Sequence, residues 1–475
     1  MNNPIETEIV VVGAGPGGYA AAFYAADKGK KVLLIEKDDR LGGVCLNRGC
    51  IPSKALLNAS HMIHAAKESA ERGISFGEPT MDLDRLREWK NSVVTKLSGG
   101  IQVLAKNRGV ETMKGRGYFE GSNTLRVETS EGQQFVKYDK AIIAVGSSAS
   151  MPRVFDLGNP RVMTSRGALE IEEIPDELLV IGGGYIGMEL GTVYSSMGSQ
   201  VTVIEALPTI LAGADPDLAR PVLKLAESRF KEIRLGAKVT SMATKGAKIE
   251  VSSQLADGEK LSELYDRVLV SVGRSPNSKD IGLENTGVVV SDRGFVEVDK
   301  SQKTADSNIY AIGDITGGYM LAHKASKEAR IAIEAICGEE SIWDDFVVPA
   351  IVFTDPEVAW CGLTEQEAKE QGRKVEVARF PWAASGRALT YDRTDGLTKL
   401  LVDPDSERIL GVGIVGHGAG ELIGEATLAV EMGASVSDLA ETIHPHPTLS
   451  ETLMESAEAF FGHATHTVSR SKSKV

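Results

Sequence analysis

The stretch IVVVGAGPGG, residues 9–18, decides the fold of this chain. Its first four residues are apolar and fit a strand that is buried on both faces, and a glycine-rich turn follows directly. In that turn Gly13 permits the tight bend, Gly15 lets backbone N–H groups approach a pyrophosphate, and Gly18 allows close packing of the next helix. The stretch therefore predicts the start of a dinucleotide-binding unit.

The segments after this turn complete a strand–helix–strand pattern. Residues 19–28 are rich in alanine and predict a helix, whose N-terminus supplies partial positive charge for a phosphate. Residues 31–35 predict the next strand, which ends at Glu36. Because Glu36 lies 18 residues beyond Gly18, its carboxylate is expected to accept hydrogen bonds from both ribose hydroxyls.

The same pattern returns later in the chain. Gly182 and Glu205 each lie 169 residues after their counterparts Gly13 and Glu36. One glycine motif is a weak signal, but two copies with matching acid spacing predict two dinucleotide sites. The second copy has a strand, a GGGYIG turn, a helix and an acid-ended strand at residues 178–181, 182–187, 188–197 and 200–205.

Glu205 indicates which nucleotide the second site takes. A carboxylate at this strand end binds a free 2′-hydroxyl and repels a 2′-phosphate, whereas NADP sites usually carry an arginine. The next three residues, 206–208, are Ala-Leu-Pro and bring no arginine. The second site is therefore predicted to bind NAD.

A cysteine pair follows closely on the first nucleotide motif, in the segment GGVCLNRGCIPSK at residues 42–54. Four residues separate Cys45 from Cys50, and a thiol pair beside a redox cofactor can relay two electrons to or from a disulfide. Cys50 lies two residues before Pro52, a residue that commonly opens helices. A helix N-terminus stabilises a thiolate, so Cys50 is expected to be the more acidic thiol.

Thiol chemistry also needs a base, because the thiolate is the nucleophile. The segment HPHPTLSE at residues 444–451 offers His446 with Glu451. Pro447 rigidifies the backbone after the histidine, and a helix beginning near residue 448 can turn the carboxylate back toward the ring. A carboxylate on one ring nitrogen fixes the tautomer and raises the basicity of the other. His444 is expected to be structural.

Composition limits the alternatives. The 475 residues predict roughly three or four domains, and the net charge of −14 disfavours nucleic acid as a partner. No apolar run reaches the ~20 residues of a membrane span. An apolar strand begins after eight residues, which leaves no room for a signal or transit peptide, so we expect a cytoplasmic or already processed protein. Besides the pair, Cys337 and Cys361 are expected to be inert buried thiols; the tail from Arg470 to Lys474 is basic.

Glycine turns mark the expected boundaries. Apolar strands at 141–145 and 268–272 each end in a glycine turn and are expected to form paired crossovers into and out of the second nucleotide unit. A strand ending at Asp314 follows, then a helix after residues 320–324. Short strands at 350–353, 397–402 and 409–415 indicate a final α+β domain. We predict an α/β protein with two Rossmann-like domains and this C-terminal domain, divided at 1–147, 148–274, 275–345 and 346–475.

With these motifs in place, the chain resembles the dihydrolipoamide dehydrogenases, flavoprotein disulfide reductases related to glutathione reductase. The resemblance covers nearly the full length. It implies FAD at the first site, NAD at the second, and a homodimer built through the C-terminal domain. The segments that carry it are residues 13–18, 42–54, 182–189, 312–314, 320–325 and 444–451.

The resemblance also implies residue roles. Cys45 exchanges with the lipoyl substrate, Cys50 faces the flavin, and His446 acts at the cysteine pair of the other subunit. Lys54 and Glu189 pair beside the flavin. Tyr185, in the second glycine loop, has two open interpretations: an aromatic lid over the flavin that NAD displaces, or a packing residue. The implied FAD residues are Gly13, Gly15, Gly18, Glu36, Lys54, Gly146, Asp314 and Ala322; the NAD residues are Gly182, Gly184, Tyr185, Gly187, Glu189, Glu205 and Gly273; no metal is implied.

The implied partners are lipoyl-domain proteins and the acyltransferase core of 2-oxo acid dehydrogenase complexes. Two alternatives stay open at this point. Another NAD(P)H-dependent flavoprotein disulfide reductase shares much of the pattern, although Glu205 disfavours NADPH and the last hundred residues lack the extra cysteine pair of a mercuric reductase. A non-catalytic flavoprotein subunit is the second alternative, which the retained cysteines, His446 and Glu451 disfavour.

Overall fold

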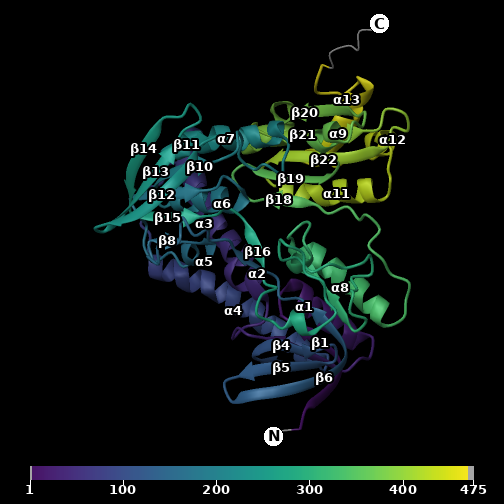
Figure 1. Cartoon of the computed structure of the whole chain (residues 1–475). Coiled ribbons are helices and arrows are strands. Elements are labelled where there is room, and N and C mark those ends of the chain that lie inside the picture. Colours follow the sequence, from purple (N-terminus) through teal and green to yellow (C-terminus); the bar gives the residue numbers. More distant parts are fainter. Residues whose placement is uncertain (1–2, 469–475) are drawn as a thin grey trace.

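The computed structural model describes residues 3–468, and the basic tail from Arg470 to Lys474 lies outside this range. Figure 1 shows three regions: a first Rossmann-like unit around β1 and α1, a second around β9 to β15, and a C-terminal unit around β18 to β22. This arrangement confirms the predicted α/β class with an added C-terminal unit. No helix within the described range is both long and apolar enough to cross a membrane.

The first unit is built on a seven-stranded sheet. Its long strand β6 pairs with β1 along one edge; along the other edge it pairs first with antiparallel β5 and then with parallel β17. The strands are β1 (Ile5–Val12), β2 (Val32–Glu36), β3 (Glu111–Lys114), β4 (Arg116–Gly121), β5 (Thr124–Thr129), β6 (Gly132–Ile143) and β17 (Ile309–Ala311). The helices are α1 (Pro16–Asp27), α2 (Gly43–Arg48), α3 (Cys50–Glu68), α4 (Leu83–Asn107) and α8 (Ala322–Ile336), with short 3-10 turns η1 (Ser69–Arg72), η2 (Leu283–Asn285) and η3 (Gly313–Thr316).

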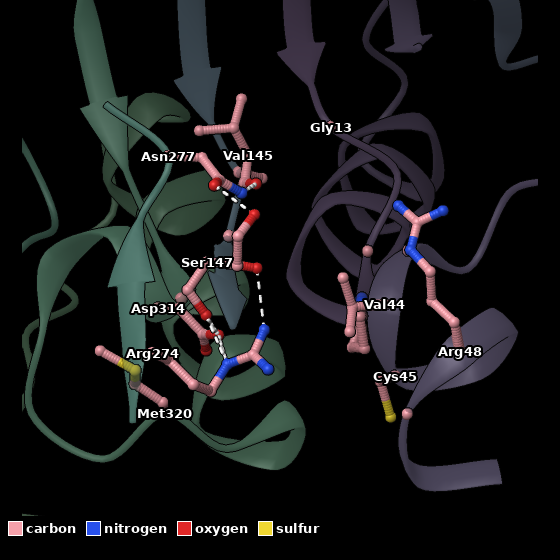
Figure 2. A pocket seen from close by; sticks show the side chains of 18 of the residues that line it. Gly13, Val44, Cys45, Arg48, Val145, Ser147, Arg274, Asn277, Asp314 and Met320 are labelled. Atoms are coloured by element: carbon pink, nitrogen blue, oxygen red, sulfur yellow. Dashed lines mark hydrogen bonds and ion pairs between the residues drawn. The ribbon is translucent and has the colours of Figure 1, made fainter. Parts of the chain in front are cut away.

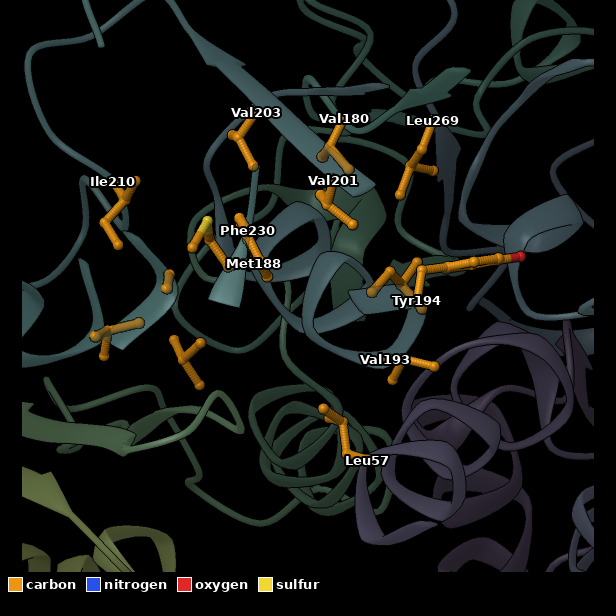
Figure 3. Close-up of a cluster of buried hydrophobic side chains, with 14 of the residues drawn as sticks. Leu57, Val180, Met188, Val193, Tyr194, Val201, Val203, Ile210, Phe230 and Leu269 are labelled. Atoms are coloured by element: carbon orange, nitrogen blue, oxygen red, sulfur yellow. The ribbon is translucent and has the colours of Figure 1, made fainter. Parts of the chain in front are cut away.

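The second unit repeats this plan with a five-stranded parallel sheet in the order β11-β10-β9-β15-β8 and an added antiparallel ribbon β12-β13-β14. Its buried core includes Met188, Tyr194 and Phe230, and Leu57 of α3 joins it from the first unit (Figure 3). The elements are β8 (Val162–Met163), β9 (Glu177–Ile181), β10 (Gln200–Glu205), β11 (Glu232–Leu235), β12 (Lys238–Lys245), β13 (Lys248–Gln254), β14 (Lys260–Tyr265), β15 (Arg267–Val270), α5 (Ser165–Ala168), α6 (Tyr185–Ser196) and α7 (Pro216–Arg229).

Two short strands connect the units. β7 (Ser147–Ala149) and β16 (Arg274–Pro276) pair antiparallel, so the chain enters and leaves the second unit side by side, as the glycine turns predicted. The apolar strands before them end two residues earlier than predicted, at Ile143 and Val270, because the backbone already turns into the crossover there.

The C-terminal unit is a five-stranded antiparallel sheet in the order β18-β19-β22-β21-β20, against which α11 and α13 pack. It confirms the predicted α+β texture. The elements are β18 (Ala350–Val352), β19 (Glu357–Gly362), β20 (Glu376–Pro381), β21 (Leu397–Val402), β22 (Ile409–Gly416), α9 (Glu365–Glu370), α10 (Gly386–Tyr391), α11 (Ala419–Glu431), α12 (Val436–Glu441), α13 (Glu451–Phe461) and the turn η4 (Trp382–Ala384).

Two sequence-based expectations need correction. Helices α1 and α6 begin at Pro16 and Tyr185, three residues before the predicted starts, because the third glycine of each motif packs inside the first helical turn. Cys337 is not buried: it caps the C-terminus of α8 and is partly exposed. Cys361 is buried as expected, and burial raises its pKa to about 11.

Candidate active site

A cavity of about 540 Å³ lies in the first unit and reaches α6 of the second. Figure 2 shows its two facing walls, with Val44, Cys45 and Arg48 on one side and Ser147, Arg274 and Asp314 on the other. A volume of this size fits a small-molecule or cofactor site. The predicted residues on its lining are Gly13, Gly15, Glu36, Cys45, Cys50, Lys54, Gly146, Tyr185, Glu189, Asp314 and Ala322.

The first glycine turn forms one end of this cavity. Gly13 has a φ of +100°, and a Cβ there would lie 2.4 Å from the Ala144 carbonyl oxygen. A Cβ at Gly18 would lie 1.8 Å from the Gly13 oxygen, which explains why Gly18 packs behind the turn and does not line the cavity. The N-terminus of α1 thus opens onto the cavity, as binding of a pyrophosphate requires.

Glu36 holds this turn in place. Its carboxylate accepts hydrogen bonds from the backbone N–H of Ala14, at 2.8 Å, and from that of Asp38, at 3.0 Å. A carboxylate has about four acceptor positions, so it retains capacity for ribose hydroxyls after accepting these two bonds. Binding of the ribose hydroxyls by Glu36 stays a prediction.

The second glycine turn repeats this geometry. Gly182 has a φ of +108°, and a Cβ at Gly187 would lie 2.0 Å from the Gly182 oxygen. Glu205 accepts from the N–H of Gly183 at 2.6 Å and from that of Leu207 at 2.7 Å. No described atom lies within 4 Å of a Cβ built at Gly184, so this turn has room for a ligand. Five predicted NAD residues do not line the main cavity: Gly182, Gly184, Gly187, Glu205 and Gly273.

The two cysteines meet at the cavity wall. Cys45 lies in α2, Cys50 is the first residue of α3, and both are free thiols that share a hydrogen bond. The hydrogen bond from Cys45 lowers the pKa of Cys50 to about 7; burial opposes this shift, and the Lys54 ammonium supports it. The same hydrogen bond and burial raise the pKa of Cys45. Cys50 is therefore the more acidic thiol, as predicted, but the main cause is the hydrogen bond from Cys45 and not the helix position on which the prediction rested.

Lys54 and Glu189 form the predicted ion pair. The Lys54 Nζ lies 3.0 Å and 2.8 Å from the two carboxylate oxygens of Glu189, whose side chain is only 4% exposed. The backbone N–H of Phe353 also donates to Glu189, at 3.0 Å, and the Phe353 ring lies under the ammonium at 4.4 Å. The pair thus joins α3, α6 and the C-terminal unit beside the cysteines.

The opposite wall contains residues that the sequence did not single out. Ser147 donates its hydroxyl hydrogen bond to Asp314, while Arg274 donates to the Ser147 hydroxyl and carbonyl oxygens, both at 2.8 Å. Asn277 donates to the Val145 carbonyl oxygen at 2.9 Å (Figure 2). Arg274 and Asn277 lie in the polar segment that follows strand β15. In the sequence, membership of this segment is the one feature that points to them as site residues.

His446 and Glu451 pair as predicted but lie apart from the cavity. The Glu451 carboxylate is 2.8 Å from His446 Nδ1 and accepts the Thr448 N–H at 2.7 Å. The His446 side chain is 70% exposed and is not part of the cavity lining in the described chain. Burial favours neutral Glu451, yet the Thr448 N–H and the His446 ring outweigh it and lower the pKa of Glu451.

His444 has the structural surroundings that the sequence predicted. Its side chain is only 3% exposed, and Nε2 lies 2.7 Å from Glu425. Nδ1 contacts the Thr442 carbonyl oxygen at 2.8 Å. Both ring nitrogens are thus engaged within the C-terminal unit.

One group of carboxylates has the spacing of a metal site. Asp215, Asp217 and Glu365 bring oxygens within 4.8 Å of one another. The buried ammonium of Lys399 lies 2.6–2.8 Å from all three and occupies the position that a cation would take. The cluster is therefore an ion-pair network between the second and C-terminal units.

Comparison with known proteins identifies the class. Residues 7–329 match the family model for pyridine nucleotide-disulphide oxidoreductases, and residues 348–457 match the dimerisation domain of the same enzymes. The chain belongs to this family. It is therefore an oxidoreductase of the flavoprotein disulfide type, and enzymes of this type use FAD and NAD. The match at 348–457 shows that the C-terminal unit is a dimerisation domain, which supports a homodimer.

Individual relatives narrow the class further. The chain is 46% identical to the dihydrolipoyl dehydrogenase of Vibrio parahaemolyticus over 465 residues, which cover 98% of each chain. It is 46% identical to that of Geobacillus stearothermophilus over 471 residues, again 98% of each. Among solved structures, the Cu(II) complex of the flavoprotein disulfide reductase RclA from Escherichia coli matches with a TM-score of 0.86 and 30% identity, covering 96% of this chain and 99% of that one. LpdA from Mycobacterium tuberculosis matches with a TM-score of 0.87 and 26% identity over the same shares.

Proposed function

We propose that this chain oxidises protein-bound dihydrolipoyl groups to the lipoyl disulfide, with NAD+ as the acceptor. The dithiol loses two electrons and two protons; NAD+ takes the electron pair and one proton, and the other proton is released. The full-length similarity to dihydrolipoyl dehydrogenases supports this substrate. The observation that carries the proposal is the contact between the Cys45 and Cys50 thiols at the cavity wall.

The cysteines alternate between disulfide and dithiol. A substrate thiolate attacks Sγ of Cys45, the bond between the cysteines breaks, and Cys50 leaves as a thiolate. The second substrate thiol then displaces Cys45 and closes the lipoyl disulfide. Because its pKa is about 7, Cys50 is the better leaving group of the two. The residues of this cavity would hold FAD, which would supply the two-electron redox chemistry between the reduced cysteines and NAD+.

We assign the main cavity to FAD and the second glycine turn to NAD. The helix N-terminus at Gly15, the carboxylate of Glu36 and the start of α8 suit a dinucleotide with a redox ring. The assigned FAD residues are Gly13, Gly15, Gly18, Glu36, Lys54, Gly146, Asp314 and Ala322. The assigned NAD residues are Gly182, Gly184, Tyr185, Gly187, Glu189, Glu205 and Gly273, and the domains divide at 1–147, 148–274, 275–345 and 346–475.

The substrate proton is taken by His446 of the partner subunit. The exposed position of this histidine, outside the cavity of its own chain, supports a role across the dimer. The Glu451 carboxylate at Nδ1 leaves Nε2 as the proton acceptor. We further propose that the enzyme works in the cytoplasm with lipoyl-domain proteins and the acyltransferase core of a 2-oxo acid dehydrogenase complex.

The test is steady-state NADH formation by the FAD-loaded protein with dihydrolipoamide. We expect turnover with NAD+ and a kcat/KM for NADP+ at least about 10-fold lower, because Glu205 repels a 2′-phosphate. Turnover of glutathione disulfide with NADPH, together with no turnover of dihydrolipoamide, would contradict both the substrate and the nucleotide assignment.

A further inference from the structure

A buried ion pair lies behind the wall of the main cavity. In α8 the Lys324 Nζ is 2.6 Å from Glu328 Oε1, and both side chains are less than one-tenth exposed. Glu328 Oε2 accepts the N–H of Gly313 at 2.7 Å, and Lys324 donates to the Gly317 carbonyl oxygen at 3.0 Å. The pair therefore ties the first turns of α8 to both ends of the η3 turn.

This turn and this helix both contribute to the cavity. Asp314 lies in η3 and Ala322 opens α8, and both are lining residues. A Cβ at Gly17 of α1 would lie 3.1 Å from the Ala325 Cβ, so the N-terminal turns of α1 and α8 are in direct contact. A shift of α8 would consequently move two parts of the wall together.

If this position contributed only to the stability of the fold, apolar side chains would be expected here in place of a charged pair. A buried ion pair adds little net stability compared with apolar side chains, but it fixes geometry and is costly when one partner is lost. Gly313 has a φ of +79°, and its N–H faces the Glu328 carboxylate, so an apolar side chain in place of Glu328 would remove the acceptor of this turn.

We propose that Glu328 and Lys324 are positioning residues that hold Asp314 and the start of α8 in the geometry that binds FAD. The inference rests on the assignment of FAD to this cavity. Glu328 acts through the backbone of η3 and does not itself line the cavity. Its loss is therefore expected to weaken FAD binding in proportion to how far Asp314 is displaced.

The experiment is FAD titration of the apoprotein, followed by flavin fluorescence. Glu328→Met removes the acceptor and should raise the Kd for FAD at least about 10-fold, whereas Glu328→Gln keeps an acceptor oxygen and should lose less. Glu334→Gln is the matched control, because this residue of α8 bonds to Tyr24 and Ser341 away from the cavity. An unchanged Kd in Glu328→Met, with only the melting temperature lowered, overturns the inference.

A double-mutant cycle separates positioning from simple loss of stability. If Glu328 acts through Asp314, the combined Glu328→Met and Asp314→Asn variant should raise the Kd by much less than the product of the single effects. Independent, multiplying effects contradict the inference. These readouts do not depend on turnover, so a protein that binds FAD as expected but fails to oxidise dihydrolipoamide contradicts the proposed function alone.

Discussion

The cavity wall and the C-terminal unit each place a carboxylate beside a basic side chain, and they do so in opposite surroundings. Glu189 is 4% exposed and holds Lys54 between three parts of the chain. Glu451 is 18% exposed and pairs with His446, whose side chain is 70% exposed and does not line the cavity of the described chain. The Lys54 ammonium thus lies beside a buried carboxylate in the cavity wall, whereas the His446 ring is largely exposed to solvent.

This difference indicates which groups each subunit of the proposed dimer contributes to an active site. Groups that tune a thiol gain from burial and fixed charge, because electrostatic interactions are stronger out of water. A base that meets a protein-bound substrate must instead be reached from outside. A dimer reconciles these demands if each chain supplies the thiol pair of its cavity wall to one site and an exposed base to the other.

The largest expected effect concerns the thiol pair at the cavity wall. Cys45→Ser removes the sulfur that the substrate attacks and should lower kcat for dihydrolipoamide at least about 10,000-fold, the scale of losing a catalytic nucleophile. FAD binding should be unaffected, since the first glycine turn is intact, and this is checked by the flavin absorbance of the purified protein. Near wild-type turnover would remove Cys45 from the mechanism.

The next largest effect concerns the exposed base, His446. His446→Gln should lower kcat at least about 100-fold, the lower range for loss of a general base. Reversible subunit exchange between this variant and Cys45→Ser tests directly whether His446 acts at the cysteines of the other subunit. Heterodimers then contain one intact site, so random pairing should restore about a quarter of wild-type activity. No recovery in confirmed heterodimers would place His446 in the site of its own chain.

The sequence predicted the fold and most of the site because both depend on local signals. The glycine turns, the acid-ended strands and the cysteine spacing each lie within a few dozen residues. Arg274 and the Phe353 N–H were missed since their partners Ser147 and Glu189 are more than a hundred residues away. Such contacts arise only when the two units and the C-terminal sheet close on one another, and no local pattern encodes them.

A third prediction compares the two carboxylates by stability. Glu189→Ala removes a buried carboxylate, leaves the partly exposed Lys54 ammonium and the Phe353 N–H without their acceptor, and should cost about 3 kcal/mol of unfolding free energy. Glu451→Ala should cost less than about 1 kcal/mol, because its histidine partner is largely solvated. Denaturant unfolding of the FAD-loaded protein measures both. Equal losses would contradict the proposed contrast between a buried and an exposed pair.

The smallest effect is a change in pH dependence. The pKa of Cys50 is lowered to about 7, so in the reduced enzyme its thiolate is present above this pH and is protonated below it.

Lys54→Met removes a charge that favours the thiolate, so the pKa of Cys50 should rise and the thiolate should form only at higher pH. Thiolate absorbance of the reduced protein, titrated under anaerobic conditions, follows this change, and Lys67→Met near the other end of α3 is the matched control. Because the hydrogen bond from Cys45 is the larger cause of the low pKa, Lys54→Met should shift the titration less than Cys45→Ala does, since alanine cannot donate this hydrogen bond. The reverse order would mean that the charge of Lys54, and not the contact between the thiols, sets the acidity of Cys50.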